Sequence, residues 1–147
     1  MRIVVQEEPF DLGAESAQFA AGHSNMGAIV TFTGVVRDND TGTLEKMVIE
    51  HYPGMTEKAL TKIAENACTR WDLGDVLVIH RFGELRPQDM IMMVATASKH
   101  RVHAFEAAEF LMDYLKSRAP FWKQEITTDG ADWVAAKEVD EEALKRW

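Results

Sequence analysis

The order of apolar patterns along the chain constrains its fold more than any other feature. Short β-rich segments come in pairs between stretches with apolar residues at helical spacing. The expected strands are Arg2–Gln6, Gly27–Val36, Leu44–Tyr52, Val76–Phe82, Met90–Ser98, Phe121–Thr128 and Trp133–Ala136. Paired strands between helices favour an α+β fold with an antiparallel or mixed sheet over a doubly wound parallel sheet.

Three helices are expected between these strands. Asp11 is a suitable N-cap for a short helix that runs through Phe19 and ends near Gly22. The second helix follows Pro53-Gly54 and the third spans His100–Lys116, before Pro120. The apolar stripe of the second is Leu60, Ile63, Ala64, Ala67 and Trp71, and that of the third is Ala104, Phe105, Ala108, Leu111, Met112 and Leu115.

Length and composition favour one soluble domain. The chain has 147 residues, of which 46% are hydrophobic and 27% charged, so residues 1–147 are expected to form a single domain with 139–147 as a charged C-terminal tail. No apolar run is long enough to span a bilayer, and the first residues lack a signal-peptide pattern. Cys68 is the only cysteine, which excludes an internal disulfide and favours the cytoplasm.

Charge is unevenly distributed along the chain. The net charge of −8 argues against nucleic-acid binding. Residues 99–123 nevertheless hold five Lys/Arg and three Asp/Glu, a local balance of +2 against −10 for the remainder. This basic segment indicates either an anion site or a solvated helix face.

The common signatures of nucleotide and zinc sites are missing. The chain has no glycine-rich phosphate loop, no His-Glu-x-x-His and no Cys-x-x-Cys, so no cofactor and no metal are expected. His100, His103 and Glu106 follow one another on the third helix, but His100 and Glu106 lie far apart around it. Cys68 has no neighbouring histidine or basic residue, which argues against a catalytic thiol.

Basic residues mark the ends of several expected elements. Arg37 ends a strand, Lys99-His100-Arg101 opens a helix whose N-terminus already favours an anion, and Lys116 closes that helix. Lys123 stands beside Phe121 and Trp122, so desolvation is expected to lower its pKa. Taken singly, each of these residues also fits an ordinary surface charge.

Five ordered segments together resemble the large, catalytic subunit of the molybdopterin synthase family. They are Gly27–Gly34, Glu50–Met55, His80–Leu85, His100-Arg101 and Asp113–Lys123. The similarity runs from about residue 1 to the terminal Lys145-Arg146-Trp147.

The resemblance implies an α/β hammerhead-type fold and a central homodimer within a heterotetramer. A small ubiquitin-like sulfur-carrier subunit would insert its C-terminal Gly-Gly thiocarboxylate into this chain. The substrate would be cyclic pyranopterin monophosphate, and the product the dithiolene of molybdopterin in molybdenum cofactor biosynthesis. The chain would thus be a sulfurtransferase, without nucleic-acid or membrane partners.

The resemblance also assigns residues to the site. Lys116 and Lys123 match the catalytic lysines, while the matches for substrate binding are Arg37, His100, Arg101, Val35, Val36, Gln124, Glu125 and Lys137. Three of these depart from the family pattern: Val35 and Gln124 replace frequent basic residues, and Lys137 replaces an arginine. Lysine keeps the charge but loses bidentate phosphate binding.

Helix length predicts a site shared between protomers. His100 and Lys116 are sixteen residues apart, or about 24 Å at 1.5 Å per residue. One small pocket cannot contain both ends of that helix. We therefore expect each site to take Lys116 and Lys123 from one protomer, and His100 and Arg101 from its twofold mate.

Two other functions remain open at this level. One is a non-catalytic module that binds a ubiquitin-like C-terminal tail, which loss of either lysine would have favoured. The other is a phosphoester hydrolase acting through His100 and Arg101, for which the chain shows neither a nucleophile nor a metal cluster.

Overall fold

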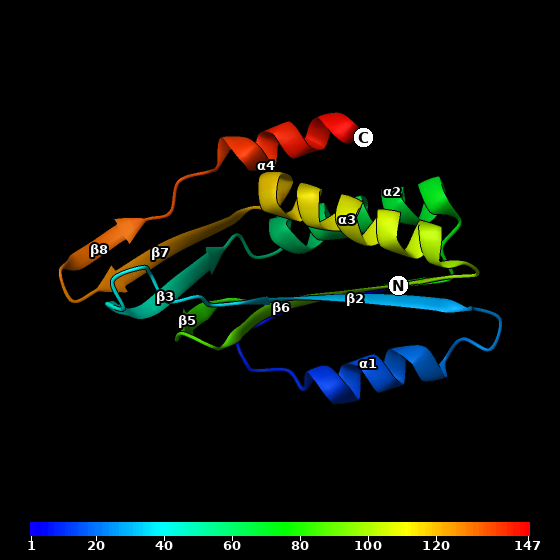
Figure 1. Ribbon diagram of the computed structural model, residues 1–147, viewed down its shortest axis with the longest axis horizontal. Helices are drawn as coiled ribbons and strands as arrows, with labels where there is room; N and C mark the ends of the chain where they lie inside the picture. Colours follow the sequence, from blue (N-terminus) through cyan, green and yellow to red (C-terminus); the bar gives the residue numbers. More distant parts are fainter.

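The chain folds into two four-stranded sheets with helices packed on the first, as the computed structural model of residues 1–147 shows (Figure 1). The strands are β1 (Arg2–Gln6), β2 (Ala28–Val35), β3 (Leu44–His51), β4 (Asp75–Arg81), β5 (Gly83–Leu85), β6 (Met90–Ser98), β7 (Phe121–Thr127) and β8 (Gly130–Trp133). The helices are α1 (Leu12–Ala21), α2 (Met55–Trp71), α3 (Arg101–Arg118), α4 (Glu138–Ala143) and the 3-10 turn η1 (Leu144–Arg146). The expected α+β class is confirmed.

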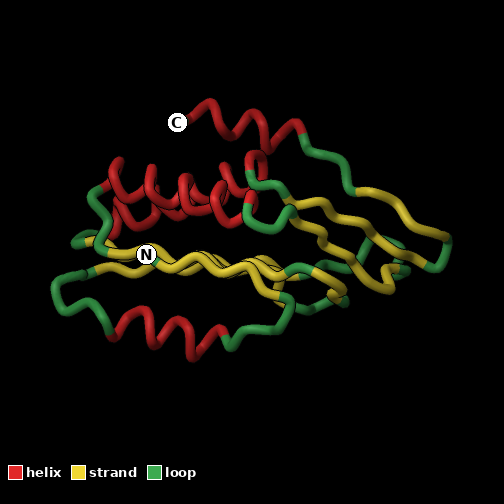
Figure 2. The backbone as a smooth tube through the Cα atoms, turned by 180° about the vertical axis from the view of Figure 1, so that it is seen from behind, coloured by secondary structure: helices red, strands yellow, loops and turns green.

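The first sheet has the order β1-β4-β6-β2 and is mixed, because β1 runs parallel to β4 while the other pairs are antiparallel. Helix α1 covers one face, and α2 and α3 cover the other (Figure 2). Both faces of the central strands β4 and β6 are therefore buried, which explains their almost continuous apolar sequences. Strand β2 forms one edge.

The second sheet, β5-β3-β7-β8, is antiparallel and extends beyond the helical layer (Figure 1). Its inner face contributes to a small core of Val36, Leu44, Met47, Ile49 and Leu85. The larger core lies between the first sheet and the helices α2 and α3. No helix of the chain is both long and apolar enough to cross a membrane.

Most expected elements are confirmed, down to the Asp11 side chain that accepts a hydrogen bond from the Ala14 amide at the start of α1. Two strand assignments differ. The segment expected to separate two strands contains β5, three residues that pair with β3. The last strand is β8 at Gly130–Trp133 rather than Trp133–Ala136, because the tight turn after Thr127 brings the chain back at once.

The expected apolar stripe of α3 was wrong at one residue. Phe105 is 60% exposed, and Ala107 and Phe110 are buried instead. The sheet below and α2 beside it both bury apolar residues of α3, so its buried surface is wider than one stripe and shifted toward α2.

The C-terminal segment is not only a charged tail. Residues 138–146 form α4 and η1, which lie over α3 (Figure 1). Trp147 packs edge-on against Trp71 and Phe110 and donates from Nε1 to Asp113 at 2.7 Å. This aromatic anchor holds the segment on the helical layer.

Candidate functional site

The junction between α3 and β7 brings the two candidate catalytic lysines together. Pro120 cannot continue a helix and restricts the preceding residue, so Ala119 is extended (φ −84°, ψ 132°) and β7 starts immediately after Pro120. The buried Thr56 hydroxyl donates to the Pro120 carbonyl at 3.1 Å and ties the junction to α2. Lys116 thus lies in the last turn of α3, and Lys123 is the third residue of β7.

Lys123 is half-buried in a positively charged environment. Burial lowers the pKa of its amine below the ordinary 10.5, and the positive charges of Lys116 and Lys137 lower it further, while Asp140 acts in the opposite sense. The expected depression of this pKa is confirmed in direction. Its cause is only partly the one expected, because alternation along β7 places Phe121 on the same face as Lys123 but the half-exposed Trp122 on the other.

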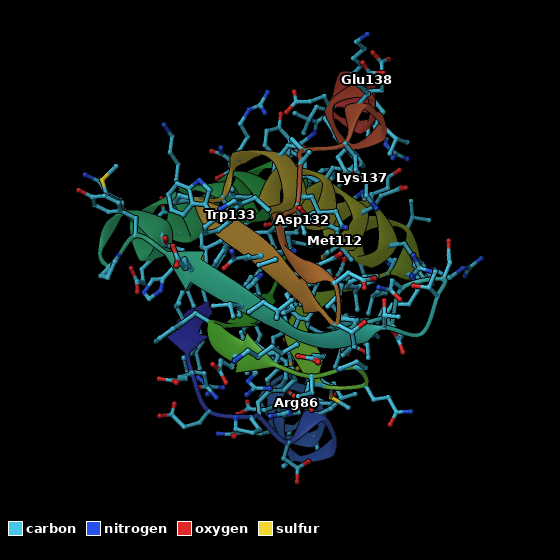
Figure 3. All side chains as sticks on the ribbon, turned by 90° about the vertical axis from the view of Figure 1, so that its left-hand side faces the viewer. Arg86, Met112, Asp132, Trp133, Lys137 and Glu138 are labelled. Atoms are coloured by element: carbon cyan, nitrogen blue, oxygen red, sulfur yellow. The ribbon has the colours of Figure 1, made fainter.

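Lys137 reaches this site from the C-terminal segment. It stands immediately before α4, where the chain leaves β8 (Figure 3). Two contacts hold α4 here: the Ser117 hydroxyl donates to the Asp140 carbonyl at 3.2 Å, and Arg118 forms a two-pronged ion pair with Glu141 at 2.7 and 3.2 Å. We call Lys116, Lys123 and Lys137 the lysine cluster.

A buried histidine lies close to Lys123. His80, at the end of β4, is 5% exposed and stacks on Phe121 with ring centroids 3.7 Å apart and planes inclined by 15°. Its Nδ1–H donates to the Arg81 carbonyl at 2.8 Å. Burial lowers the pKa of His80 from 6.5 to about 3, and the charges of Lys123 and His51 act in the same direction, so the ring is neutral at physiological pH.

His100 and Arg101 lie at the opposite end of α3. Both are exposed, and neither side chain forms a hydrogen bond within the chain. The first turn of α3 holds no acidic residue and no side chain caps it, so its amide groups and the helix dipole leave an uncompensated positive end. The two ends of α3, Arg101 and Lys116, are separated by about 22 Å at 1.5 Å per residue. An anion can bind at this end of α3, but Lys116 of the same protomer is too far away to contact that anion.

The end of β2 carries Val35, Val36 and Arg37. Arg37 is 82% exposed, and its only ion pair is a 3.3 Å contact with Asp40. Val35 is about half exposed. Val36 is a core residue whose amide and carbonyl bond to the 88–89 turn, so it has no free group for a ligand. In Figure 1 this end of β2 points the same way as the C-terminal end of α3.

The side chains of Gln124 and Glu125, which follow Lys123, point to opposite faces of β7. Glu125 shares the Lys123 face of β7 and is half-buried, whereas Gln124 points to the opposite face, beside Trp133 of β8. The structure therefore gathers Lys116, Lys123 and Lys137, and separates from them Gln124, His100 and Arg101. Sequence reasoning missed Asp140 and His80. In the sequence His80 was marked only as part of the segment His80–Leu85 that carries the family resemblance, and nothing marked Asp140.

Two other groups offer no competing site. No three His, Cys, Asp or Glu side chains lie close enough together to hold a metal ion. Cys68 is half-buried on α2, where burial raises the pKa of its thiol and keeps it protonated. The chemistry available is that of amines, a guanidinium group and a helix N-terminus.

The fold gathers amines around one half-buried lysine, and a second cationic site lies at the far end of the same helix. These features define a protein that handles a small anionic ligand. Comparison with known proteins gives the family. Residues 5–118 match the family model described as MoaE protein. A relative from Cereibacter sphaeroides named molybdopterin synthase catalytic subunit is 67% identical over 147 residues and covers 100% of both chains.

Two further comparisons agree. A relative of the same name from Ralstonia nicotianae is 60% identical over 146 residues, which are 99% of this chain and 83% of the relative. A solved structure described as a molybdopterin biosynthesis MoaE protein from Burkholderia ambifaria has a TM-score of 0.86 and 51% identity, and the match covers 99% of this chain and 97% of the other. The chain belongs to the MoaE family, the family of molybdopterin synthase catalytic subunits.

Proposed function

We propose that this chain transfers sulfur from the thiocarboxylated C-terminus of a small ubiquitin-like carrier to cyclic pyranopterin monophosphate, forming the dithiolene of molybdopterin. The observation that carries the proposal is the lysine cluster, with a half-buried Lys123 of lowered pKa, in a chain of this family. Amines of this kind suit a reaction in which an anionic donor meets an anionic substrate and protons must move.

The two lysines have different roles in this proposal. Lys116 is exposed at the end of α3, where it orients the carrier thiocarboxylate and the pterin carbon that the sulfur attacks. Lys123 is half-buried, and its lowered pKa brings it closer to the pH of the reaction. It acts as the general acid and base, or stabilises the negative charge that develops on the pterin.

The phosphate is held by the second cationic site. Arg101 and the imidazole of His100 are exposed at the start of α3, whose first turn adds free amide groups, and the Arg37 guanidinium is exposed after β2. Lys137 adds positive charge beside Lys123. Val35 and Glu125 lie at the margin of this region, and Val36 and Gln124 contribute to its framework rather than to ligand contact.

The single cysteine of the chain indicates that another molecule donates the sulfur. The product carries two new sulfurs, whereas the chain has only Cys68, whose thiol is half-buried and protonated. The relatives are named as catalytic subunits, which fits an assembly with a second, sulfur-carrying subunit. A single unpaired cysteine also fits a cytoplasmic location.

We further propose that the site is shared across a homodimer. At about 100° per residue, Arg101, Phe105, Met112 and Lys116 fall on one flank of α3. This flank is not covered by α2, which contacts Phe110, or by α4, which contacts Ser117. Phe105 is 60% exposed on it, and Phe32 of the edge strand β2 is 41% exposed. Two such flanks, related by a twofold axis, would place Arg101 of one protomer near Lys116 of its mate.

The test is a reconstitution with thiocarboxylated carrier and cyclic pyranopterin monophosphate. Dithiolene product is expected from the wild-type chain, and Lys116→Ala should reduce the rate at least about 100-fold. Carrier binding without product would indicate a binding module, and free phosphate would indicate a hydrolase. Conversion by Lys116→Ala at the wild-type rate would overturn the role of Lys116.

A further inference from the structure

His80 holds an unused hydrogen-bond acceptor beneath the lysine cluster. A carbonyl oxygen only accepts, so the 2.8 Å contact with Arg81 fixes the hydrogen of His80 on Nδ1. The neutral ring therefore presents a lone pair on Nε2. No hydrogen bond within the chain uses Nε2, and no fully buried side-chain nitrogen or oxygen lacks a partner, so Nε2 keeps some solvent-accessible surface.

The strands place this ring close to Lys123. Along β4, Val76 and Val78 point to the core beneath α2 and α3, and alternation places His80 on the same face. Phe121 stacks on His80, and Lys123 follows two residues later on the same face of β7. The stack fixes the tilt of the ring, and the bond from Nδ1 fixes its rotation.

We propose that His80 is a positioning residue for Lys123: its Nε2 accepts a hydrogen bond from the Lys123 ammonium group and orients that group toward the substrate. This inference rests on the proposed function of Lys123. Lys116 and Lys137 both repel the ammonium group, and Asp140 attracts it. A neutral acceptor orients the group without neutralising it, and a histidine whose pKa is about 3 does not take the proton.

Substitution of His80 by asparagine or by glutamine tests the roles of its two ring nitrogens separately. The amide of His80→Asn reaches the Nδ1 position and keeps the bond to the Arg81 carbonyl, whereas the amide of His80→Gln reaches the Nε2 position and can accept from Lys123. If His80 positions Lys123, His80→Gln should retain kcat within about threefold, and His80→Asn should lose about tenfold. A purely structural histidine would give the reverse order.

Two further measurements complete the test. Competitive acylation of Lys123, followed by mass spectrometry over a range of pH, reports its pKa without any turnover. Loss of the acceptor in His80→Asn should lower that pKa relative to His80→Gln, because the ammonium form loses a hydrogen bond. Lys116, Lys137 and Asp140 around Lys123, and His51 near His80, stay unchanged in both variants.

The second measurement is a double-mutant cycle. In a Lys123→Ala background, His80→Asn should cause no further loss of kcat, since the two act together. Additive losses, or equal kcat and equal Lys123 pKa in the two His80 variants, would overturn the role of His80. Full activity of Lys123→Ala itself would instead overturn the proposed function of Lys123, so the two failures are distinguishable.

Discussion

At the scale of single residues, the site depends on groups whose charge the fold disfavours. Lys123 and His80 both have lowered pKa values, and burial is the largest cause for each. Such perturbation is frequent at functional sites, because a proton-transfer group needs a pKa near the pH of its reaction. Burying groups of lowered pKa also reduces the free energy of unfolding, and this reduction can be measured.

Lys123→Met should lower activity and raise stability together. The folded pKa of Lys123 is below its unfolded value of about 10.5, so the unfolded chain binds more protons between these two values and stability rises with pH through that window. Below the folded pKa the loss of unfolding free energy is complete, and it amounts to about 1.4 kcal/mol for each pH unit by which the pKa of Lys123 is lowered. At about pH 7 the variant should unfold at equal or higher urea concentration, with kcat reduced at least about 100-fold. A less stable variant would contradict the cost assigned to Lys123.

His80 should make the protein acid-sensitive. Its pKa is about 3 in the folded chain and 6.5 in the reference state, so between these values the unfolded chain holds a proton that the folded chain lacks. Stability therefore falls as pH drops through this window. His80→Gln should make the slope of unfolding free energy against pH shallower by up to about 1.4 kcal/mol per pH unit. Urea titrations between about pH 4 and 7 test this, with His103→Gln, an exposed histidine of α3, as control. Identical slopes for His80→Gln and wild type would be the contrary result.

At the scale of elements, the C-terminal segment links stability to the site. Trp147 anchors it on Trp71 and Phe110, and the α4 end carries Lys137 and Asp140 to Lys123. Trp147→Ala should reduce the unfolding free energy by about 2 kcal/mol, less than a fully buried tryptophan would cost because Trp147 is only half-buried. Val139→Ala, at a position 68% exposed in α4, should change it by less than about 0.5 kcal/mol. Equal effects of the two changes would show that the anchor contributes nothing.

The elements that the sequence predicted well are those with one dominant pattern. Strand β6 is an almost continuous apolar run and helix α2 has clear helical periodicity, and both were placed within about two residues. Phe105 was misplaced because periodicity finds an apolar face without showing which of its residues the other elements of the chain cover. The C-terminal helix was missed because it has no buried residue of its own: it is stabilised by Trp147 and by Arg118 on α3.

The site residues likewise divide into those that the sequence predicted and those that it did not. Lys116, Lys123 and Lys137 were expected from a family resemblance, and the structure brings them together through α3, β7 and α4. Asp140 lies in a stretch that looks like solvated charge, and only the docking of α4 brings it near Lys123. Contacts between distant segments of this kind leave no local pattern in a sequence.

At the scale of the whole molecule, the exposed flank of α3 predicts assembly. Phe105→Glu places a charge on the flank without disturbing the core, because Phe105 is 60% exposed. We expect a folded monomer in sedimentation and a loss of activity of at least about tenfold, whereas Val139→Glu, 68% exposed on α4, should remain dimeric. A dimeric and fully active Phe105→Glu chain would place the interface elsewhere.

Complementation tests whether the two ends of α3 serve different sites. Lys116→Ala and Arg101→Ala chains should each be inactive alone. Random mixing makes about half of the dimers heterodimers, and in each of these one of the two sites keeps both Lys116 and Arg101. About a quarter of wild-type activity should therefore return. Lys116→Ala mixed with Lys123→Ala is the matched control, because both lysines belong to the same protomer's site and no heterodimer can restore one. Recovery in the first mixture and not in the second requires a shared site, since a site complete within one protomer gives no recovery in either.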